Sequence, residues 1–129
     1  MTQSINTSGS TFKASLHILP ILEEFRKISP ILQMQQAVIF VHIGATPGVT
    51  LRDLERLCGL GSAAVSRNVS TLGVKNWKGE PGFGLVESKV DPDDRRYKRV
   101  SLTPKGQRIY ETLKLLATHG QEASHDGDT

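Results

Sequence analysis

The residues with the most evident chemistry stand at 90–106, which read "VDPDDRRYKRVSLTPKG". Within 91–99, three aspartates lie beside four basic side chains. The stretch could therefore be a metal site, a surface for a polyanion or a solvated charged loop. An EF-hand calcium loop needs alternating oxygen ligands, a central glycine and a final glutamate, which are absent here. Arg95 and Arg96 would also repel a cation, so the stretch predicts no metal site.

Other constellations do not predict a metal site, a cofactor or an enzyme. The four histidines are scattered, and none has zinc-ligand spacing with the single cysteine, Cys58. Ser66 and Ser70 have no nucleophile-elbow context and no histidine and acid placed to complete a triad. The "GLGS" stretch does not follow a strand, so it is not a phosphate-binding fingerprint. We expect Cys58 to be a buried core thiol rather than a redox switch.

Positive charge is concentrated in the middle of the chain. The net charge is +3 overall, but residues 50–110 carry +5, whereas residues 111–129 carry −3. A basic middle region attracts a polyanion, although many basic faces are only solvated.

The sequence predicts a cytoplasmic protein that does not bind membranes. One cysteine cannot form an internal disulfide, which favours a reducing compartment. No apolar run reaches the roughly 20 residues that cross a bilayer, and the N-terminus does not resemble a signal peptide.

Residues 50–72 predict two short helices joined by a tight turn. Thr50 and Asp53 have the spacing of a capping box, and Gly59 is suited to end the first helix. Leu51, Leu54 and Cys58 share one face of the first helix, and Val65, Val69 and Leu72 form the inward stripe of the second. This is the pattern of a helix-turn-helix.

The predicted outer face of the second helix is small and polar: Ser62, Ala63, Ser66, Arg67 and Ser70. Short side chains allow a helix to approach a DNA groove, where arginine and serine can reach bases or phosphates. An ordinary helical hairpin with a polar outer face is the alternative.

Residues 84–90 and 97–102 predict two strands around the charged tip 91–96, a β-hairpin. A helix capped by Thr103 follows, with Pro104 in its first position and Ile109, Leu113 and Leu116 as its apolar stripe. A helix-turn-helix followed by a charged hairpin is a winged helix. The predicted fold class is mainly α with a small β-hairpin (α+β), a winged helix-turn-helix.

The remaining segments predict two N-terminal helices, a connector and two tails. The first helix covers 15–28 and is either kinked at Pro20 or begins there. The second is capped by Ser29 and runs to Gly44, largely buried. Residues 73–83 predict a loop with Trp77 packed beneath it. The domain thus covers 15–118, between a flexible tail at 1–14 and a frayed end at 119–129.

The segments "LRDLERLCGLGSAAVSRNVSTL" and "GLVESKVDPDDRRYKRVSLTPKG" resemble MarR-type winged-helix transcription regulators over about residues 30–116. The resemblance implies a homodimer on a pseudopalindromic operator, with residues 62–72 in the major groove and the wing in the flanking minor groove. In the family's wing, an aspartate precedes by two positions an arginine that enters the minor groove; these are Asp94 and Arg96 here. A narrow minor groove attracts arginine, and a carboxylate can orient a guanidinium.

We therefore predict a sequence-specific regulator of double-stranded DNA, a dimeric repressor without enzymatic activity or cofactor; whether it has a small-molecule effector is left open. The predicted DNA contacts are Ser62, Ala63, Ser66, Arg67, Ser70, Asp94, Arg95, Arg96, Lys98 and Arg99. The alternatives are a winged helix that binds proteins and a replication or phage accessory protein that binds DNA. Two departures from the family's pattern stand out: a long connector at 73–84 and a short C-terminal helix. Dimerisation is expected through 15–28 and 104–118.

Overall fold

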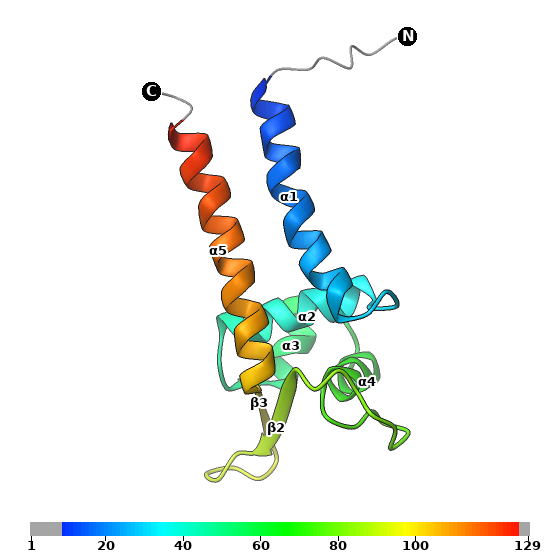
Figure 1. Cartoon of the computed structure of the whole chain (residues 1–129). Helices are drawn as coiled ribbons and strands as arrows, with labels where there is room; N and C mark the ends of the chain where they lie inside the picture. The colour runs from blue at the N-terminus through cyan, green and yellow to red at the C-terminus, as the bar shows by residue number, and fades with distance from the viewer. Residues whose placement is uncertain (1–8, 127–129) are drawn as a thin grey trace. The chain divides into compact units, whose positions relative to one another are not determined.

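The structure is a computed structural model that describes residues 9–126 (Figure 1). Its elements are α1 (Gly9–Ile28), α2 (Met34–Ala45), β1 (Val49–Thr50), α3 (Leu51–Cys58), α4 (Ser62–Leu72), β2 (Val86–Val90), β3 (Lys98–Leu102) and α5 (Pro104–Asp126). They form two units. Residues 31–110 make one unit; the described residues up to Pro30 and from Glu111 make the other.

The unit 31–110 contains an antiparallel sheet with the order β1-β3-β2. Strand β3 pairs with β2 from Val86–Leu102 to Val90–Lys98, which confirms the predicted hairpin. Strands β2 and β3 with residues 91–97 between them are called the wing below, and Figure 1 shows the wing projecting from α2, α3 and α4. Strand β1 has only two residues and was not predicted; it exists because Val49 pairs with Val100.

One apolar core joins the helices of this unit to the sheet. Its fully buried large side chains are Ile39, Phe40, Ile43, Leu54, Val65, Leu72, Leu85, Val86 and Val100. The edge of the Phe40 ring faces Tyr110 on α5, with ring centroids 6.3 Å apart. Helix α2 is less enclosed than expected, since Met34, Val38 and Val41 are exposed.

Capping interactions fix the helix-turn-helix as predicted. Thr50 Oγ1 accepts a hydrogen bond from the Asp53 N–H at 3.0 Å, and Asp53 Oδ2 accepts one from the Thr50 N–H at 3.3 Å. Gly59 ends α3 in the left-handed conformation (φ 64°), which glycine adopts without a steric penalty.

The wing and α5 meet at Thr103, the predicted cap. Its hydroxyl donates to the Gly84 carbonyl at 2.7 Å and accepts from the Gly106 N–H at 3.1 Å. Gly106 lies against the Leu85 carbonyl, where a Cβ would collide with the backbone. Strand β2, strand β3 and the first turn of α5 are therefore held at one joint.

Several predicted helix boundaries differ from the structure. Helix α1 begins at Gly9 and contains Pro20, so residues 9–14 are helical rather than a tail. The proline is tolerated because this part of α1 is exposed, and water can bind the carbonyl that lacks an N–H partner. Helix α2 does not start at Ser29: its first turn is closed by Gln36 Oε1, which accepts from the Gln33 N–H at 2.9 Å.

The C-terminal helix is also longer than expected, because α5 continues to Asp126, past the boundary placed at 118. Residues 1–8 and 127–129, the outer parts of the two expected tails, lie outside the described residues.

Leu54 tests the assignment of the α3 core face. Leu54 is fully buried, whereas Leu57 on the same helix is 51% exposed. Leu54→Ala should lower the free energy of unfolding by about 2–5 kcal/mol because it leaves a cavity. The matched variant Leu57→Ala should cost less than about 1 kcal/mol. Urea unfolding followed by circular dichroism measures both, and equal losses would contradict the assignment.

Candidate nucleic-acid interface

Helix α4 presents the outer face that the sequence predicted. Ser62, Ala63, Ser66 and Arg67 are exposed, and Ser70 is half-buried, with its Oγ donating to the Lys75 carbonyl at 3.4 Å. The opposite face is buried through Val65, Asn68, Val69 and Leu72.

Asn68 was not predicted to matter, yet it ties α4 to α2. Its Oδ1 accepts from Gln36 Nε2 at 3.4 Å, and its Nδ2 donates to Gln35 Oε1 at 3.3 Å. The sequence carries no distinctive signal for this pattern, because Asn and Gln are mostly exposed residues and nothing local marks the one that is buried between two helices.

The tip of the wing holds an arginine in a two-point ion pair. Arg96 Nε donates to Asp94 Oδ1 at 3.0 Å and Nη2 to Oδ2 at 2.8 Å, while the Arg96 backbone N–H donates to Oδ1 at 3.1 Å. These hydrogen bonds lower the pKa of Asp94 and raise the pKa of Arg96. The Arg96 side chain stays 82% exposed. A carboxylate thus orients a guanidinium that still faces solvent.

A second ion pair lies at the base of the wing. Arg99 Nε donates to Asp91 Oδ2 at 2.8 Å, and Arg99 Nη1 donates to the Gly48 carbonyl at 2.9 Å. The Asp93 N–H donates to Asp91 Oδ1 at 2.8 Å. This backbone hydrogen bond and then the Arg99 interactions lower the pKa of the buried Asp91 carboxyl. Arg99 therefore connects the wing to the turn before β1.

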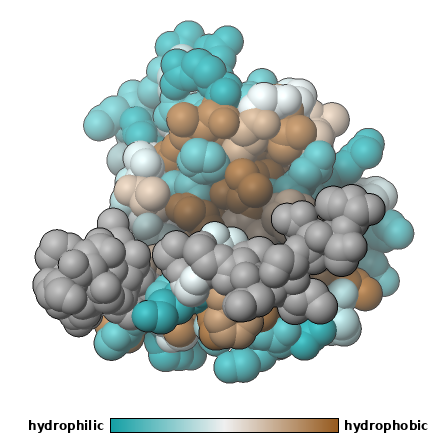
Figure 2. Space-filling model, turned by 90° about the horizontal axis from the view of Figure 1, so that it is seen from above, coloured by the Kyte–Doolittle hydropathy of each residue, from teal (hydrophilic) through white to brown (hydrophobic). Residues whose placement is uncertain are grey.

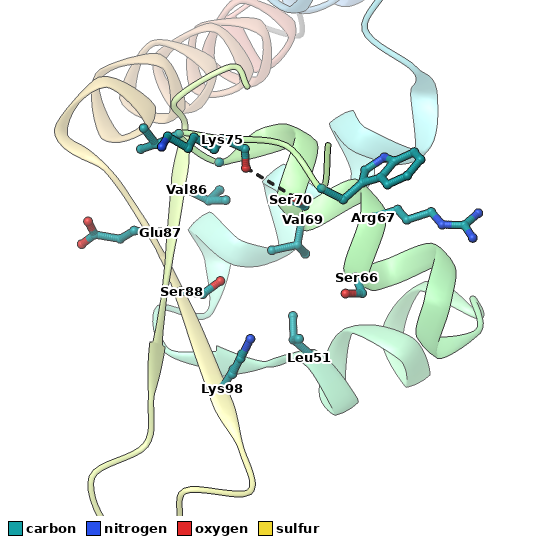
Figure 3. A pocket seen from close by; sticks show the side chains of 13 residues that line it. Leu51, Ser66, Arg67, Val69, Ser70, Lys75, Val86, Glu87, Ser88 and Lys98 are labelled. Carbon is teal, nitrogen blue, oxygen red and sulfur yellow. Dashed lines mark hydrogen bonds between the residues drawn. The ribbon is translucent and has the colours of Figure 1, made fainter. Parts of the chain in front are cut away.

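Two hollows lie beside the wing, one toward α4 and the other toward α3. One, of about 420 Å³, lies between α4, the connector and the wing strands, and Figure 3 shows Ser66, Ser88 and Lys98 around it. The other, of about 440 Å³, lies between the start of α3 and the wing, and is lined by Arg52, Arg96 and Lys98 among others. Basic side chains thus border both sides of the wing.

The structure brings half of the ten predicted DNA contacts to these hollows. Ser66, Arg67, Ser70 and Lys98 line the first, and Arg96 and Lys98 line the second. Ser62 and Ala63 are exposed at the start of α4, and Arg95 is exposed on the wing. Arg52, Lys75 and Trp77 also line the hollows but were not predicted there.

The expectation that Trp77 packs beneath the connector is wrong. Trp77 is 60% exposed. Arg67 Cζ lies 5.7 Å and Lys78 Nζ 5.2 Å from the centroid of its ring. Two cations within about 6 Å of an indole give cation–π contacts that favour this placement.

The other predicted chemistries can be located as well. Cys58 is half-buried, and burial raises the pKa of its thiol. Among residues 9–126 as described, no three His, Cys, Asp or Glu side chains are grouped to hold a metal ion. In the same part of the chain, no helix has the length and apolar character that crossing a bilayer requires.

The family model for a winged helix DNA-binding domain matches residues 32–106. No curated protein matches the sequence. Among solved structures, Streptococcus pneumoniae FabT in complex with DNA is 19% identical with a TM-score of 0.67, over 91% of this chain and 78% of that one. S. aureus MepR in its DNA complex is 18% identical with a TM-score of 0.63, over 92% and 86%. A MarR protein from Peptoclostridium difficile is 20% identical with a TM-score of 0.58, over 100% and 82%. The predicted fold is confirmed.

The ion pair at the base of the wing should make stability depend on pH. Because the pKa of Asp91 is lowered in the folded state, its stabilisation is fully present above the ordinary aspartate pKa of about 3.9. It is lost as the pH falls through the lower folded-state value. Asp91→Asn should therefore be less stable than the wild type at pH 7, and the gap should shrink below about pH 4. Urea unfolding of the wild type and the variant at pH 7 and below about pH 4 measures the difference in the free energy of unfolding.

Asp93→Asn is the matched control, since it removes the same charge from an exposed neighbour. A gap for Asp91→Asn that persists unchanged at about pH 3 would mean that Arg99 does not stabilise the wing through this carboxylate.

Proposed function

The chain belongs to the winged helix DNA-binding domain family, and from this premise we propose that it is a dimeric, sequence-specific transcription repressor. The observation that carries the proposal is the Asp94–Arg96 pair, which presents an oriented guanidinium at the exposed tip of the wing. FabT and MepR, which share the fold, have each been solved with DNA.

In this proposal α4 enters the major groove. Ser62 and Ala63 are small enough for close approach of the helix backbone. Ser66 and Ser70 offer hydroxyls for bases or phosphates, and Arg67 can donate two hydrogen bonds to a guanine edge. Asn68 holds α4 against α2, so that the reading face does not rotate.

The wing contacts the flanking minor groove. Arg96, oriented by Asp94, enters the groove, where a narrow width strengthens the negative potential. Arg95 and Lys98 are exposed beside it and neutralise phosphates. Arg99 supports the wing from its base rather than by direct contact, because its guanidinium is shared between Asp91 and Gly48.

A second copy of the chain covers apolar surface on the terminal helices. Helix α1 exposes Phe12, Leu16, Ile18, Leu19 and Leu22, and α5 exposes Leu115. Figure 2 shows apolar residues at the surface of the face seen from above. Large exposed apolar patches mark interaction sites. Helix α5 has 23 residues, longer than the short C-terminal helix expected, and so supplies more length for such an interface. A homodimer then reads two inverted half-sites, and its occupancy of the operator blocks transcription in the cytoplasm.

Arg96→Ala should weaken binding to the operator and lower the salt dependence of affinity. The probe is a duplex that the protein selects from a pool with a randomised centre. Loss of one phosphate contact in each protomer, two in the dimer, reduces the slope of log K against log salt concentration by about 1.8. Asp94→Asn should weaken binding but keep the slope, since the positive charge remains. Fluorescence anisotropy at several salt concentrations measures both.

Arg56→Gln, which removes an exposed charge from α3, is the control and should bind like the wild type. An Arg96→Ala variant with unchanged affinity for the duplex and an unchanged salt slope would contradict the assignment of the wing as a DNA contact. A wild-type protein that selects no sequence and binds no duplex would instead favour a winged helix that binds proteins.

Leu16→Glu should convert the dimer to a monomer, because it places a charge in the apolar stripe formed with Phe12 and Leu19. Ala14→Glu adds the same charge to an exposed position about half a turn round α1 and should leave the dimer intact. Size-exclusion chromatography with light scattering measures the mass. A wild-type monomer, or equal effects of the two variants, would contradict dimerisation through this stripe.

A further inference from the structure

The long connector is a folded element rather than a loose link. Residues 74–83, called the connector loop below, contain a bridge between Lys75 and Pro81. At the tip, the Asn76 N–H donates to the Glu80 carbonyl at 2.7 Å, and Asn76 Oδ1 accepts from the N–H groups of Lys78 and Glu80, both at 2.9 Å. Gly79 completes the turn with φ 81°. The backbone of the tip is therefore held in a defined turn.

Backbone hydrogen bonds close the base of the connector loop against the end of α4. The Gly84 N–H donates to the Gly73 carbonyl at 2.8 Å, and the Leu85 N–H donates to the Leu72 carbonyl at 2.7 Å. The Phe83 N–H donates to the Thr71 carbonyl at 2.9 Å. The connector loop thus extends from the C-terminal end of α4 and returns to it.

This tip presents an aromatic ring among positive charges. Trp77 is exposed between Lys78 of the connector loop and Arg67 of α4. Lys75 is exposed as well, and with Arg67 and Trp77 it lines the hollow beside α4 (Figure 3). The basic outer face of α4 therefore continues onto the connector loop.

Charge indicates which partner this surface fits. Glu80 is the one acidic residue in the connector loop. Its carboxylate accepts from Asn76 Nδ2 at 3.4 Å. The indole lies against a guanidinium on the face of α4 that is proposed to read bases. A basic, aromatic surface continuous with a candidate DNA-reading helix suits phosphates and bases better than an apolar protein partner.

We propose that the connector loop is a third DNA-contacting element beside α4 and the wing. Lys75 and Lys78 bind phosphates at the edge of the major groove, and Trp77 positions Arg67 by stacking on its guanidinium. This inference rests on the proposed function, but it assigns DNA contacts to a segment that neither the helix-turn-helix nor the wing includes.

Trp77 is the sole tryptophan of the chain, so its fluorescence reports directly on the connector loop. The selected duplex, which carries a fluorescent dye, is titrated with the wild-type protein, and the anisotropy of the dye measures binding. Trp77 emission should change with the same midpoint, and quenching by neutral acrylamide should weaken because DNA covers the ring. Binding seen by anisotropy, with emission and quenching unchanged, would overturn this inference and leave the proposed function standing.

Substitutions distinguish the phosphate contacts of the two lysines from the positioning of Arg67 by Trp77. Lys75→Gln and Lys78→Gln each remove one phosphate contact per protomer, so each should lower the salt slope of the dimer by about 1.8 and weaken binding to selected and scrambled duplexes alike. Trp77→Ala should weaken binding of the dimer to the selected duplex by about five- to thirty-fold, because each protomer loses one exposed cation–π contact, with less effect on the scrambled duplex. Trp77→Phe should restore part of the loss.

Arg56→Gln is again the charge control, and circular dichroism melting confirms that each variant is folded. Variants that all bind like the wild type would refute the third contact alone. A wild-type protein that binds no duplex would overturn both this inference and the proposed function.

Discussion

The geometry of the DNA-binding unit depends on hydrogen bonds that meet at the backbone of Leu85. Its N–H donates to the Leu72 carbonyl at the end of α4, and its carbonyl accepts from the Thr103 N–H before α5. Gly106 packs against the same carbonyl, where no larger residue fits. Since Leu85 is fully buried, this joint is also protected from water. The spacing between α4 and the wing is therefore set by backbone contacts rather than by surface charges.

The wing uses the same ion pair, aspartate with arginine, for two different purposes. At the base, Asp91 is buried, and its pairing with Arg99 joins the wing to the turn before β1. At the tip, Asp94 is half-buried and Arg96 is exposed, and an ion pair so open to solvent adds little to stability. The tip pair instead restricts the guanidinium to one orientation. The two pairs have the same residue types and differ in burial. The more buried pair at the base stabilises the wing, and the more exposed pair at the tip is available to a ligand.

The parts of this fold that local sequence determines were predictable. Thr50, Asp53 and Gly59 act through neighbours within a few residues, as does Thr103 where it caps α5 through Gly106, so capping rules locate them. Strand β1 could not be predicted, because two residues become a strand only by pairing with β3. The prediction that Trp77 is buried was wrong for a similar reason. Hydrophobicity alone predicts burial, but the contact between the indole ring and the Arg67 guanidinium depends on the tertiary structure. The contacts of Asn68 with α2 likewise join residues more than thirty positions apart.

Because the base of the connector loop is closed, the position of the wing does not depend on the length of the loop. Because Gly73 and Gly84 are joined by a hydrogen bond, strand β2 would start at the same place after a much shorter link. The entropy of closing a loop rises only slowly with its length, so insertions here cost little stability. The segment can consequently gain, lose or exchange residues while the core and the wing keep their geometry. It is a position at which target preference can diverge between proteins that otherwise share one scaffold.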